Sequence, residues 1–339
     1  MSRTELAPYF HPTQIVLVDD DIDFLGNLSL QLEADLPYLL FDSTHKALSY
    51  INDRKADHRS RQRFFRVSEG PGDERQVVID TESIVREMHF SNRFSQISVA
   101  MVDYAMPQMN GLEFCRRIEN PHIKKILFTG VATESDAVEA FNTGVIDRFI
   151  RKSERHVYDH LNSTIRELQQ AHIRDTFAAA SDVLDVAAPA LLADPEIIAL
   201  MDDLRTRYRI VEYYLVSEPT GFLLVDGEGH LYRLVLSSPA DREFQVKRAK
   251  AANAPSDCLK ILARGEALLD PAVLDAAAAR SDILRHWPRY ARGAVALKSD
   301  PSCRWAVFDQ RDVEGAPAAP QSTFSRYLEW LDTVGYSLM

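Results

Sequence analysis

Side chains of three chemical kinds, at widely spaced positions, could together bind and accept a phosphoryl group. Asp19, Asp20 and Asp103 supply carboxylate oxygens. Carboxylates that converge repel one another unless a cation joins them, and hard oxygen ligands favour Mg²⁺. The hydroxyl of Thr129 and the ammonium of Lys152 could then surround the phosphoryl oxygens. If the fold brings these side chains together, they would suit an aspartate that accepts a phosphoryl group.

Each of these residues comes shortly after a short apolar segment of the kind that forms a buried parallel strand. The expected strands are 14–18, 39–41, 97–102, 125–128 and 148–150, and the expected helices are 22–35, 44–51, 111–118, 135–142 and a long one from about 156. Strands that alternate with helices predict right-handed crossovers and a parallel sheet. Because ligands lie outside the carboxyl ends of such strands, we expect the polar residues to meet at one sheet edge.

Four stretches, in this order, resemble the signature of bacterial response-regulator receiver domains. They are VDD at 18–20, MVDYAMPQMNG at 101–111, LFTG at 127–130 and FIRK at 149–152. The resemblance covers about residues 13–168 and implies the CheY-like fold of that family. That fold is a doubly wound, flavodoxin-like α/β domain with a five-stranded parallel sheet.

The resemblance also implies a role for each matching residue. Asp103 would be the phosphoacceptor, with Thr129 and Lys152 as the other catalytic residues that bind phosphoryl oxygens. A Mg²⁺ cofactor would be held by Asp19, Asp20, Asp103 and the main-chain carbonyl of Ala105.

One further residue matches the aromatic that moves with the active-site threonine when a receiver is activated. This is Phe149, which the resemblance implies to be a switch residue. Each assignment also has a plainer structural explanation. Asp19 or Asp21 could cap the first helix, and Phe149 could be an ordinary core residue.

A polar insertion at about residues 53–96 separates the second helix from the third strand. It could hold a strand at 76–79 and a helix at 81–89. It carries a basic cluster at Arg54, Lys55, Arg59, Arg61, Arg63 and Arg66. Such a cluster is typical of a solvated surface loop, and the alternative is a contact for phosphate or an acidic partner.

The rest of the chain predicts a helical connector at 169–194 and a second, α+β domain at 195–339. Its expected helices are one beginning near 195 and those at 242–252, 256–263, 271–287 and 324–334, and its expected strands are 212–216, 221–225, 231–236 and 305–308. We find no helix-turn-helix pattern of the kind that DNA-binding output domains use. This half therefore favours an output by protein–protein interaction.

Composition limits the partners and the compartment. The 339 residues carry a formal net charge of −11, which argues against general binding to nucleic acid or to an anionic membrane surface. The chain has three cysteines and no CxxC pair, and it shows neither an apolar leader nor a long apolar segment. We therefore expect a cytoplasmic protein, and the resemblance to receiver domains implies a bacterial one.

Together these observations predict a response regulator of a two-component phosphorelay. Its partner would be a histidine kinase or a phosphotransfer protein, and it would have no enzymatic activity beyond its own phosphorylation and dephosphorylation. The face formed by helix 135–142 and strand 148–150 could rearrange a homodimer or release the C-terminal domain, which would act on an output protein. Two alternatives stay open: the C-terminal half is a small-molecule sensor or an unrecognised enzyme, or the basic insertion binds nucleic acid.

Overall fold

A computed structural model describes residues 5–53, 64–69, 75–130, 134–184, 189–277, 283–311 and 313–334. The chain folds into two compact units, and each is assembled from separate parts of the sequence. The parallel-sheet unit consists of residues 10–79, 90–187 and 324–339. The antiparallel-sheet unit consists of residues 1–9, 80–89 and 188–323.

The parallel-sheet unit is built on a five-stranded parallel sheet, as the sequence predicts. Its strands lie in the order β3 (Tyr38–Phe41), β2 (Gln14–Val18), β6 (Ile97–Val102), β7 (Lys124–Thr129) and β8 (Arg148–Arg151). All four neighbouring pairs are parallel. Every residue of β2 and β6 is buried, because helices cover both faces of the sheet.

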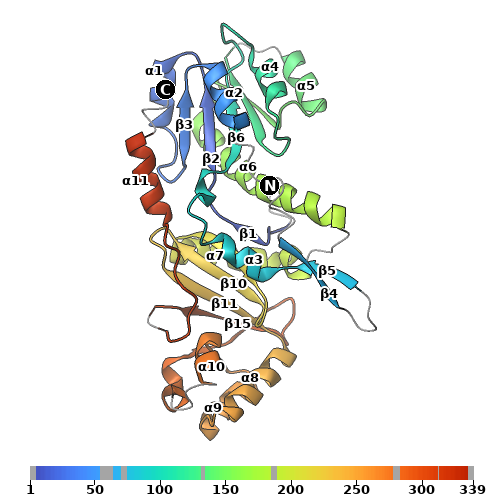
Figure 1. The fold of residues 1–339 in the computed structure, drawn as a ribbon, viewed down its shortest axis with the longest axis vertical. Coiled ribbons are helices and arrows are strands. Elements are labelled where there is room, and N and C mark those ends of the chain that lie inside the picture. Colours follow the sequence, from blue (N-terminus) through green and yellow to red (C-terminus); the bar gives the residue numbers. More distant parts are fainter. Residues whose placement is uncertain are drawn as a thin grey trace. The chain divides into compact units, whose positions relative to one another are not determined.

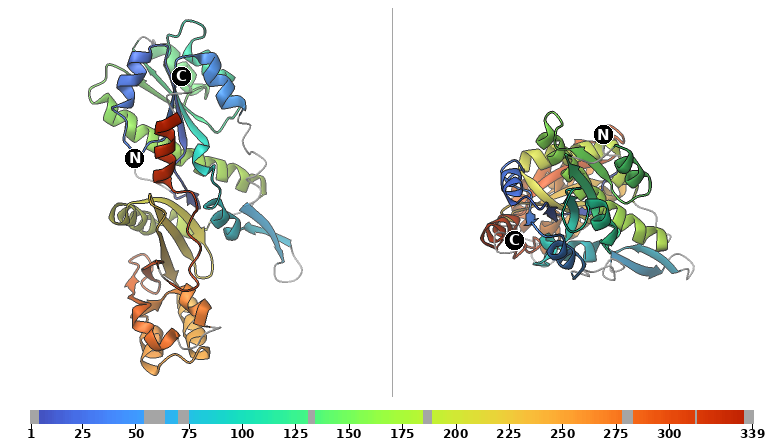
Figure 2. Two further views of the ribbon diagram at one scale, coloured as in Figure 1. Left: turned by 60° about the vertical axis from the view of Figure 1, so that its left-hand side comes forward. Right: turned by 90° about the horizontal axis from the view of Figure 1, so that it is seen from above.

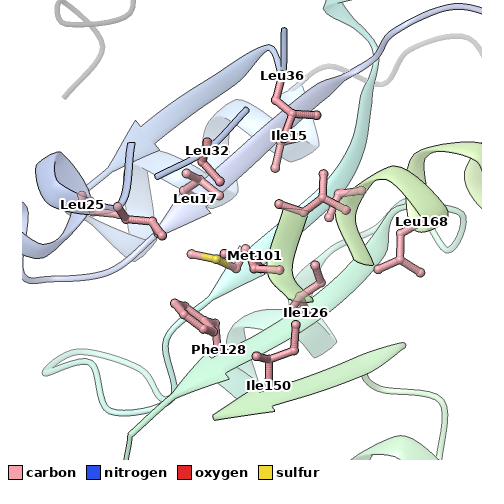
Figure 3. Close-up of a cluster of buried hydrophobic side chains, with 14 of the residues drawn as sticks. Ile15, Leu17, Leu25, Leu32, Leu36, Met101, Ile126, Phe128, Ile150 and Leu168 are labelled. Atoms are coloured by element: carbon pink, nitrogen blue, oxygen red, sulfur yellow. The ribbon is translucent and has the colours of Figure 1, made fainter. Parts of the chain in front are cut away.

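Helices α1 (Ile22–Ser29) and α6 (Val157–Leu184) cover one face of this sheet. Figure 3 shows the cluster that they bury, in which Met101, Ile126 and other strand residues project toward side chains of the two helices. Helices α2 (Thr44–Asp53) and α4 (Gly111–Arg117) contact the strands from the other side (Figure 1). Helix α5 (Glu134–Asn142) connects β7 to β8. The layers are those of a doubly wound fold.

Helix α1 is shorter than the sequence predicts, because it ends at Ser29 and not near residue 35. The side chain of Asn162 on α6 explains the difference. Its Nδ2 donates a hydrogen bond to the carbonyl of Gln31, and its Oδ1 accepts one from the amide of Glu33. The backbone after α1 therefore forms hydrogen bonds with a side chain of α6 instead of continuing as helix α1.

The expected insertion contains regular structure. Strands β4 (Phe65–Glu69) and β5 (Arg75–Ile79) form an antiparallel hairpin, and helices α3 (Thr81–Glu87) and η2 (Arg93–Ser95) follow. The ring of Phe65 packs on Phe177 of α6, with the ring centroids 5.1 Å apart. Of the basic cluster, only Arg66 belongs to the described residues, where it is exposed; Arg54, Lys55, Arg59, Arg61 and Arg63 lie outside them.

The antiparallel-sheet unit has α+β structure. Its sheet runs in the order β1 (Tyr9–Phe10), β9 (Ile210–Val216), β10 (Gly221–Asp226), β11 (Leu231–Ser237), β15 (Arg304–Asp309) and β14 (Val295–Ala296). Its other elements are η3 (Ala190–Ala193), α7 (Pro195–Tyr208), α8 (Pro239–Ala251), α9 (Ser256–Arg264), β12 (Ala267–Leu269), α10 (Pro271–Ala277), η4 (Ile283–Arg289) and β13 (Ala291–Gly293). Helices α8, α9 and α10 share a second apolar core.

The stretch expected as one helix at 271–287 holds a 3₁₀ segment at its C-terminal end. Helix α10 ends at Ala277, and the described chain resumes with the 3₁₀ segment η4, whose backbone leaves helical geometry at His286. Pro288 lies two residues further on. Proline lacks an N–H donor and disfavours helical geometry at the residue before it, which accounts for irregular backbone in this stretch.

The terminal helix α11 (Phe324–Val334) groups with the parallel-sheet unit, although we expected it within a domain at 195–339. Its Phe324 and Tyr327 rings pack on Phe94, with centroids 5.2 and 5.3 Å apart. The Nε2 of Gln14 also donates a 3.1 Å hydrogen bond to the Tyr327 hydroxyl. Figures 1 and 2 show α11 (red) beside strands and helices that are far from it in sequence.

Helix α6 extends to Leu184 and so occupies most of the expected connector at 169–194. Among the described residues, no helix combines the length and the apolar character that crossing a lipid bilayer requires.

Candidate functional site

The ammonium of Lys152 joins two carboxylates at the carboxyl edge of the parallel sheet. Its Nζ lies 2.7 Å from Oδ2 of Asp19 and 2.8 Å from Oδ1 of Asp103. Both aspartates are buried, with 3% and 7% of their surface exposed, while the Lys152 side chain keeps 24% of its surface exposed. Three residues spread over more than 130 positions of the chain therefore form one partly buried ionic cluster, as the strand-end pattern predicts.

The sheet itself fixes where these three residues stand. The amide of Asp19 donates to the carbonyl of Phe41, and the amide of Asp103 donates to the carbonyl of Val18. The amide of Lys152 donates to the carbonyl of Thr129 at 3.0 Å. Each site residue thus bonds to the end of a neighbouring strand, so sheet hydrogen bonds set the spacing of the side chains.

Local amides hold the two carboxylates in place. The second oxygen of Asp19, Oδ1, accepts a 3.0 Å hydrogen bond from the amide of Asp21. The second oxygen of Asp103, Oδ2, accepts a 2.6 Å hydrogen bond from the amide of Ala105. The cap of α1 is Asp21, whose Oδ1 accepts from the amide of Phe24, and this leaves Asp19 to face Lys152.

Two aromatic rings flank the Lys152 ammonium. Its Nζ lies 3.9 Å from the centroid of the Phe24 ring and 6.0 Å from that of Phe128. A cation over an aromatic face gains roughly 0.5–2 kcal/mol, depending on its solvation. The sequence does not predict this role for Phe24, because nothing in the residue pattern separates a core ring from one that also faces a cation.

Burial and pairing act in opposite directions on the ionised groups. Removal from water raises the pKa of the Asp19 carboxyl above its ordinary value, and the hydrogen bonds from Lys152 and Asp21 only partly counter this. Burial alone would lower the pKa of Lys152, but the hydrogen bonds to Asp103 and Asp19, together with the negative charges of these residues, outweigh burial and raise the pKa. Lys152 therefore stays a cation at neutral pH.

The raised pKa of Asp19 predicts a pH-dependent stability. Because the folded protein holds a proton on Asp19 more tightly than the unfolded chain does, this group stabilises the fold below about pH 4, its pKa in the unfolded chain. That contribution is lost as the pH rises through the folded-state pKa. We expect the free energy of unfolding of the wild type, minus that of Asp19→Asn, to decrease as the pH is raised from 4 to 7. Urea unfolding in EDTA measures this difference. A constant or growing difference would contradict the argument.

The other predicted site residues differ in burial and in their contact with the cluster of Asp19, Asp103 and Lys152. Thr129 is buried at the end of β7, next to Lys152 through the backbone bond described above. Asp20 and Ala105 are exposed, and the amide of Ala105 donates a hydrogen bond to Asp103. Phe149 is half-buried on β8. The structure thus gathers Asp19, Asp103 and Lys152 closely, whereas it does not bring the Asp20 carboxylate into the cluster.

Gly111 lies against the backbone of the phosphoacceptor candidate. A Cβ atom at this position would come within 2.2 Å of the Asp103 carbonyl oxygen and 2.9 Å of a Leu127 methyl group. The amide of Gly111 donates to the carbonyl of Tyr104 at 2.9 Å, which closes the loop after β6. A steric constraint therefore explains why glycine occupies the end of the matched stretch at 101–111, because only a residue without a side chain allows this close approach.

The donor set fits a hard divalent cation that keeps part of its water shell. Asp19 and Asp103 each place an oxygen within 2.8 Å of the same ammonium nitrogen, so both carboxylates point toward one position. Mg²⁺ is commonly bound by one or two carboxylates and several waters. Within the part of the chain that the structure describes, no three histidine, cysteine or acidic side chains converge as a metal-binding group.

Comparisons with known proteins indicate the family of this chain. The model of the response regulator receiver domain family matches residues 68–162. The structure of the Legionella pneumophila response regulator LqsR is 31% identical to this chain, with a TM-score of 0.74, and the match covers 98% of both chains. No curated protein matches the sequence.

Two isolated receiver domains also match about half of the chain. One, from Methanospirillum hungatei JF-1, is 18% identical, with a TM-score of 0.31, over 48% of this chain and 98% of its own. The other, from an HD domain-containing protein of Pseudomonas fluorescens Pf-5, is 20% identical, with a TM-score of 0.32, over 48% of this chain and 97% of its own. The match to the Legionella regulator spans both units at 31% identity, and on that basis the chain belongs to the response-regulator family.

Proposed function

We propose that Asp103 accepts a phosphoryl group and that Lys152 and Thr129 bind it there. The observation that carries this proposal is the pair of contacts from Lys152 Nζ to Asp103 and Asp19, at 2.8 and 2.7 Å. They place a cation beside the carboxylate that would react and beside a second acid that could share a metal ion. Phosphoryl transfer depends mainly on such positioning and charge stabilisation.

The donor would be a phosphohistidine of a histidine kinase or of a phosphotransfer protein. An oxygen of the Asp103 carboxylate attacks the phosphorus, a P–O bond forms, and the P–N bond to the donor histidine breaks. The Lys152 ammonium can then pair with an oxygen of the new acyl phosphate. Bound Mg²⁺, held by Asp19 and Asp103, with the carbonyl of Ala105 and the carboxylate of Asp20 as further ligands, would neutralise charge on the phosphoryl oxygens.

Incubation with acetyl phosphate and Mg²⁺ tests the proposal directly. We expect intact mass spectrometry to show addition of one phosphoryl group to the wild type and none to Asp103→Asn, because an amide does not attack phosphorus. Asp42→Asn is the matched control, since Asp42 also follows a strand of the same sheet, β3, but pairs with Lys46 instead of Lys152. If the wild type takes up no phosphoryl group, or if Asp103→Asn takes it up normally, the proposal fails.

We propose that the signal leaves through the face of α5 and β8. Val138 and Phe141 on α5 have 58% and 53% of their surface exposed, which leaves apolar area for a partner. Phe149, half-buried on β8, would change its packing when a phosphoryl group draws Thr129 toward Asp103. The face would then rearrange a homodimer or change how the antiparallel-sheet unit engages an output protein.

The family is one of signalling proteins rather than enzymes, and we propose a protein–protein output for the antiparallel-sheet unit. The alternative in which this unit senses a small molecule is supported by a cavity of about 500 Å³ in it, a volume within the range of small-molecule sites, roughly 300–1,000 Å³.

A further inference from the structure

The Lys152 ammonium has contacts of two kinds, with carboxylates and with an aromatic ring. Its Nζ lies 2.7 Å from Oδ2 of Asp19 and 2.8 Å from Oδ1 of Asp103. It also lies 3.9 Å from the centroid of the Phe24 ring. The two carboxylates belong to the residues that would hold Mg²⁺, whereas a phenyl ring is not a ligand of this hard cation. The two kinds of contact should therefore respond differently when the metal binds.

The loop that carries Asp19 also sets the position of Phe24. The amide of Asp21 donates a 3.0 Å hydrogen bond to Oδ1 of Asp19. The carboxylate of Asp21 in turn accepts a 2.9 Å hydrogen bond from the amide of Phe24 and so caps helix α1. Phe24 lies in the first turn of α1, three residues after this cap. Two consecutive hydrogen bonds therefore tie the backbone of Phe24 to the carboxylate of Asp19 at the sheet edge.

The ring of Phe24 contacts both the apolar core and the ionic cluster. It packs on Phe128, with the ring centroids 6.2 Å apart and the ring planes at 36° to each other. Phe128 is buried in the core cluster that Figure 3 shows, whereas Phe24 is only partly buried. An aliphatic side chain could also fill a partly buried position on this core. The aromatic face adds what an aliphatic side chain lacks, a negative surface that attracts a cation.

Binding of Mg²⁺ would weaken the carboxylate contacts of Lys152. A carboxylate that ligates the metal shares its negative charge with it, so Asp19 and Asp103 would attract the ammonium less. The ammonium and the divalent cation would also repel each other at close distance. The ring of Phe24 does not compete for the metal, because Mg²⁺ takes oxygen ligands. The contact between Phe24 and Lys152 is therefore the one that can persist in the metal-bound protein.

We propose that Phe24 is a positioning residue that holds the Lys152 ammonium beside Asp103 while Asp19 and Asp103 bind Mg²⁺. This inference rests on the proposed transfer of a phosphoryl group to Asp103. The Lys152 side chain has 24% of its surface exposed, so without the ring it could turn toward solvent once its carboxylate contacts weaken. With the ring, the ammonium already faces the phosphoryl oxygens when they arrive. A charge that is positioned in advance needs no reorganisation during the reaction.

NMR spectroscopy of the full-length protein, labelled with ¹³C-lysine, measures this contact without any phosphorylation. Protons held over the face of an aromatic ring resonate at unusually high field, and the Lys152 signals are assigned by their absence in Lys152→Met. We expect the Cε protons of Lys152 to be shifted upfield both in EDTA and in saturating Mg²⁺, and the shift to be lost in Phe24→Leu. A shift that disappears when Mg²⁺ is added, or that remains in Phe24→Leu, would refute the proposal.

A double-mutant cycle separates positioning from packing. In acetyl phosphate and Mg²⁺, Phe24→Leu should lower the initial rate of phosphoryl uptake about fivefold, because the ammonium loses its aromatic contact. Phe24→Tyr keeps an aromatic face and should retain most of the rate. In a Lys152→Met background, Phe24→Leu should change the remaining rate by less than about twofold, since the ring then has no ammonium to hold. Equal effects of Phe24→Leu in both backgrounds would show that the ring acts through packing alone, and the proposal would be wrong.

Phe177→Leu is the matched control. Phe177 lies on α6 in the same unit and packs on Phe65 with the ring planes at 31°, much as Phe24 packs on Phe128. It should leave the Lys152 signals and the rate of uptake unchanged, and a loss of rate equal to that of Phe24→Leu would overturn the proposal. If the wild type takes up no phosphoryl group, the proposed function fails, while the NMR measurement still decides whether Phe24 holds Lys152 in Mg²⁺.

Discussion

Replacing Lys152 by methionine should lower the free energy of unfolding of the parallel-sheet unit by about 3 kcal/mol in EDTA. Lys152 is the shared cation of two buried carboxylates, at 2.7 Å from Asp19 and 2.8 Å from Asp103. Removing one partner of a buried ionic cluster leaves charges without compensation, which typically costs about 3–5 kcal/mol. We place the effect at the lower end because Asp19, whose pKa is already raised by burial, can take up a proton.

Hydrogen exchange of strands β2 and β6, followed by mass spectrometry, measures this loss within the unit that carries the site. Lys46→Met is the control, because it breaks an exposed pair with Asp42 at 4.0 Å, and such pairs contribute about 0–1 kcal/mol. Added Mg²⁺ should restore much of the lost protection in Lys152→Met, since a divalent cation can take the place of the ammonium between the two acids. A loss below 1 kcal/mol in EDTA would show that the carboxylates do not depend on Lys152.

The substitution Gly111→Ala should destabilise the same unit by about 2–3 kcal/mol and slow phosphoryl uptake. The added Cβ would lie 2.2 Å from the carbonyl oxygen of Asp103, and backbone cannot move aside as a flexible side chain can. Overpacking of this kind typically costs about 1–3 kcal/mol. Since the atom displaced belongs to Asp103 itself, the carboxylate should lose its alignment with Lys152.

Gly26→Ala provides a control in which the added methyl group should stabilise the fold instead of destabilising it. Gly26 lies inside helix α1, is exposed, and has no atom within 4 Å of the position that a Cβ would take. Alanine in a helix interior is more favourable than glycine by about 0.5–1 kcal/mol. In Gly111→Ala, the protection of β6 from hydrogen exchange and the rate of phosphoryl uptake from acetyl phosphate should thus both decrease. In Gly26→Ala, both should stay equal or increase. Similar behaviour of the two variants would refute the steric explanation.

Much of the parallel-sheet unit follows from local sequence. Buried apolar runs such as 14–18 and 97–102, each followed by an acid, predict strands and their polar ends, and the structure confirms both strands. The length of α1 could not be predicted in the same way. It depends on Asn162, which lies more than 120 residues further along the chain and bonds to the backbone after Ser29.

The candidate site, too, could be predicted only in part from the sequence. The pairing of Asp19, Asp103 and Lys152 follows from the rule that ligands gather at the carboxyl ends of parallel strands. The ring of Phe24 over the ammonium depends on the exact rotation of α1, which residue spacing does not specify.

The interleaved segments of the two compact units have a consequence for how the protein is made. Helix α11 belongs to the parallel-sheet unit, and its Phe324 and Tyr327 pack on Phe94. During translation, this unit cannot acquire its full set of contacts until the whole intervening unit and residues 324–334 have left the ribosome. Domains that are continuous in sequence are instead able to fold one after another, beginning at the N-terminus. A gene fragment cut near residue 168 or 187 would therefore encode a receiver that lacks its final helix and the contacts of Phe324 and Tyr327 with the Phe94 ring.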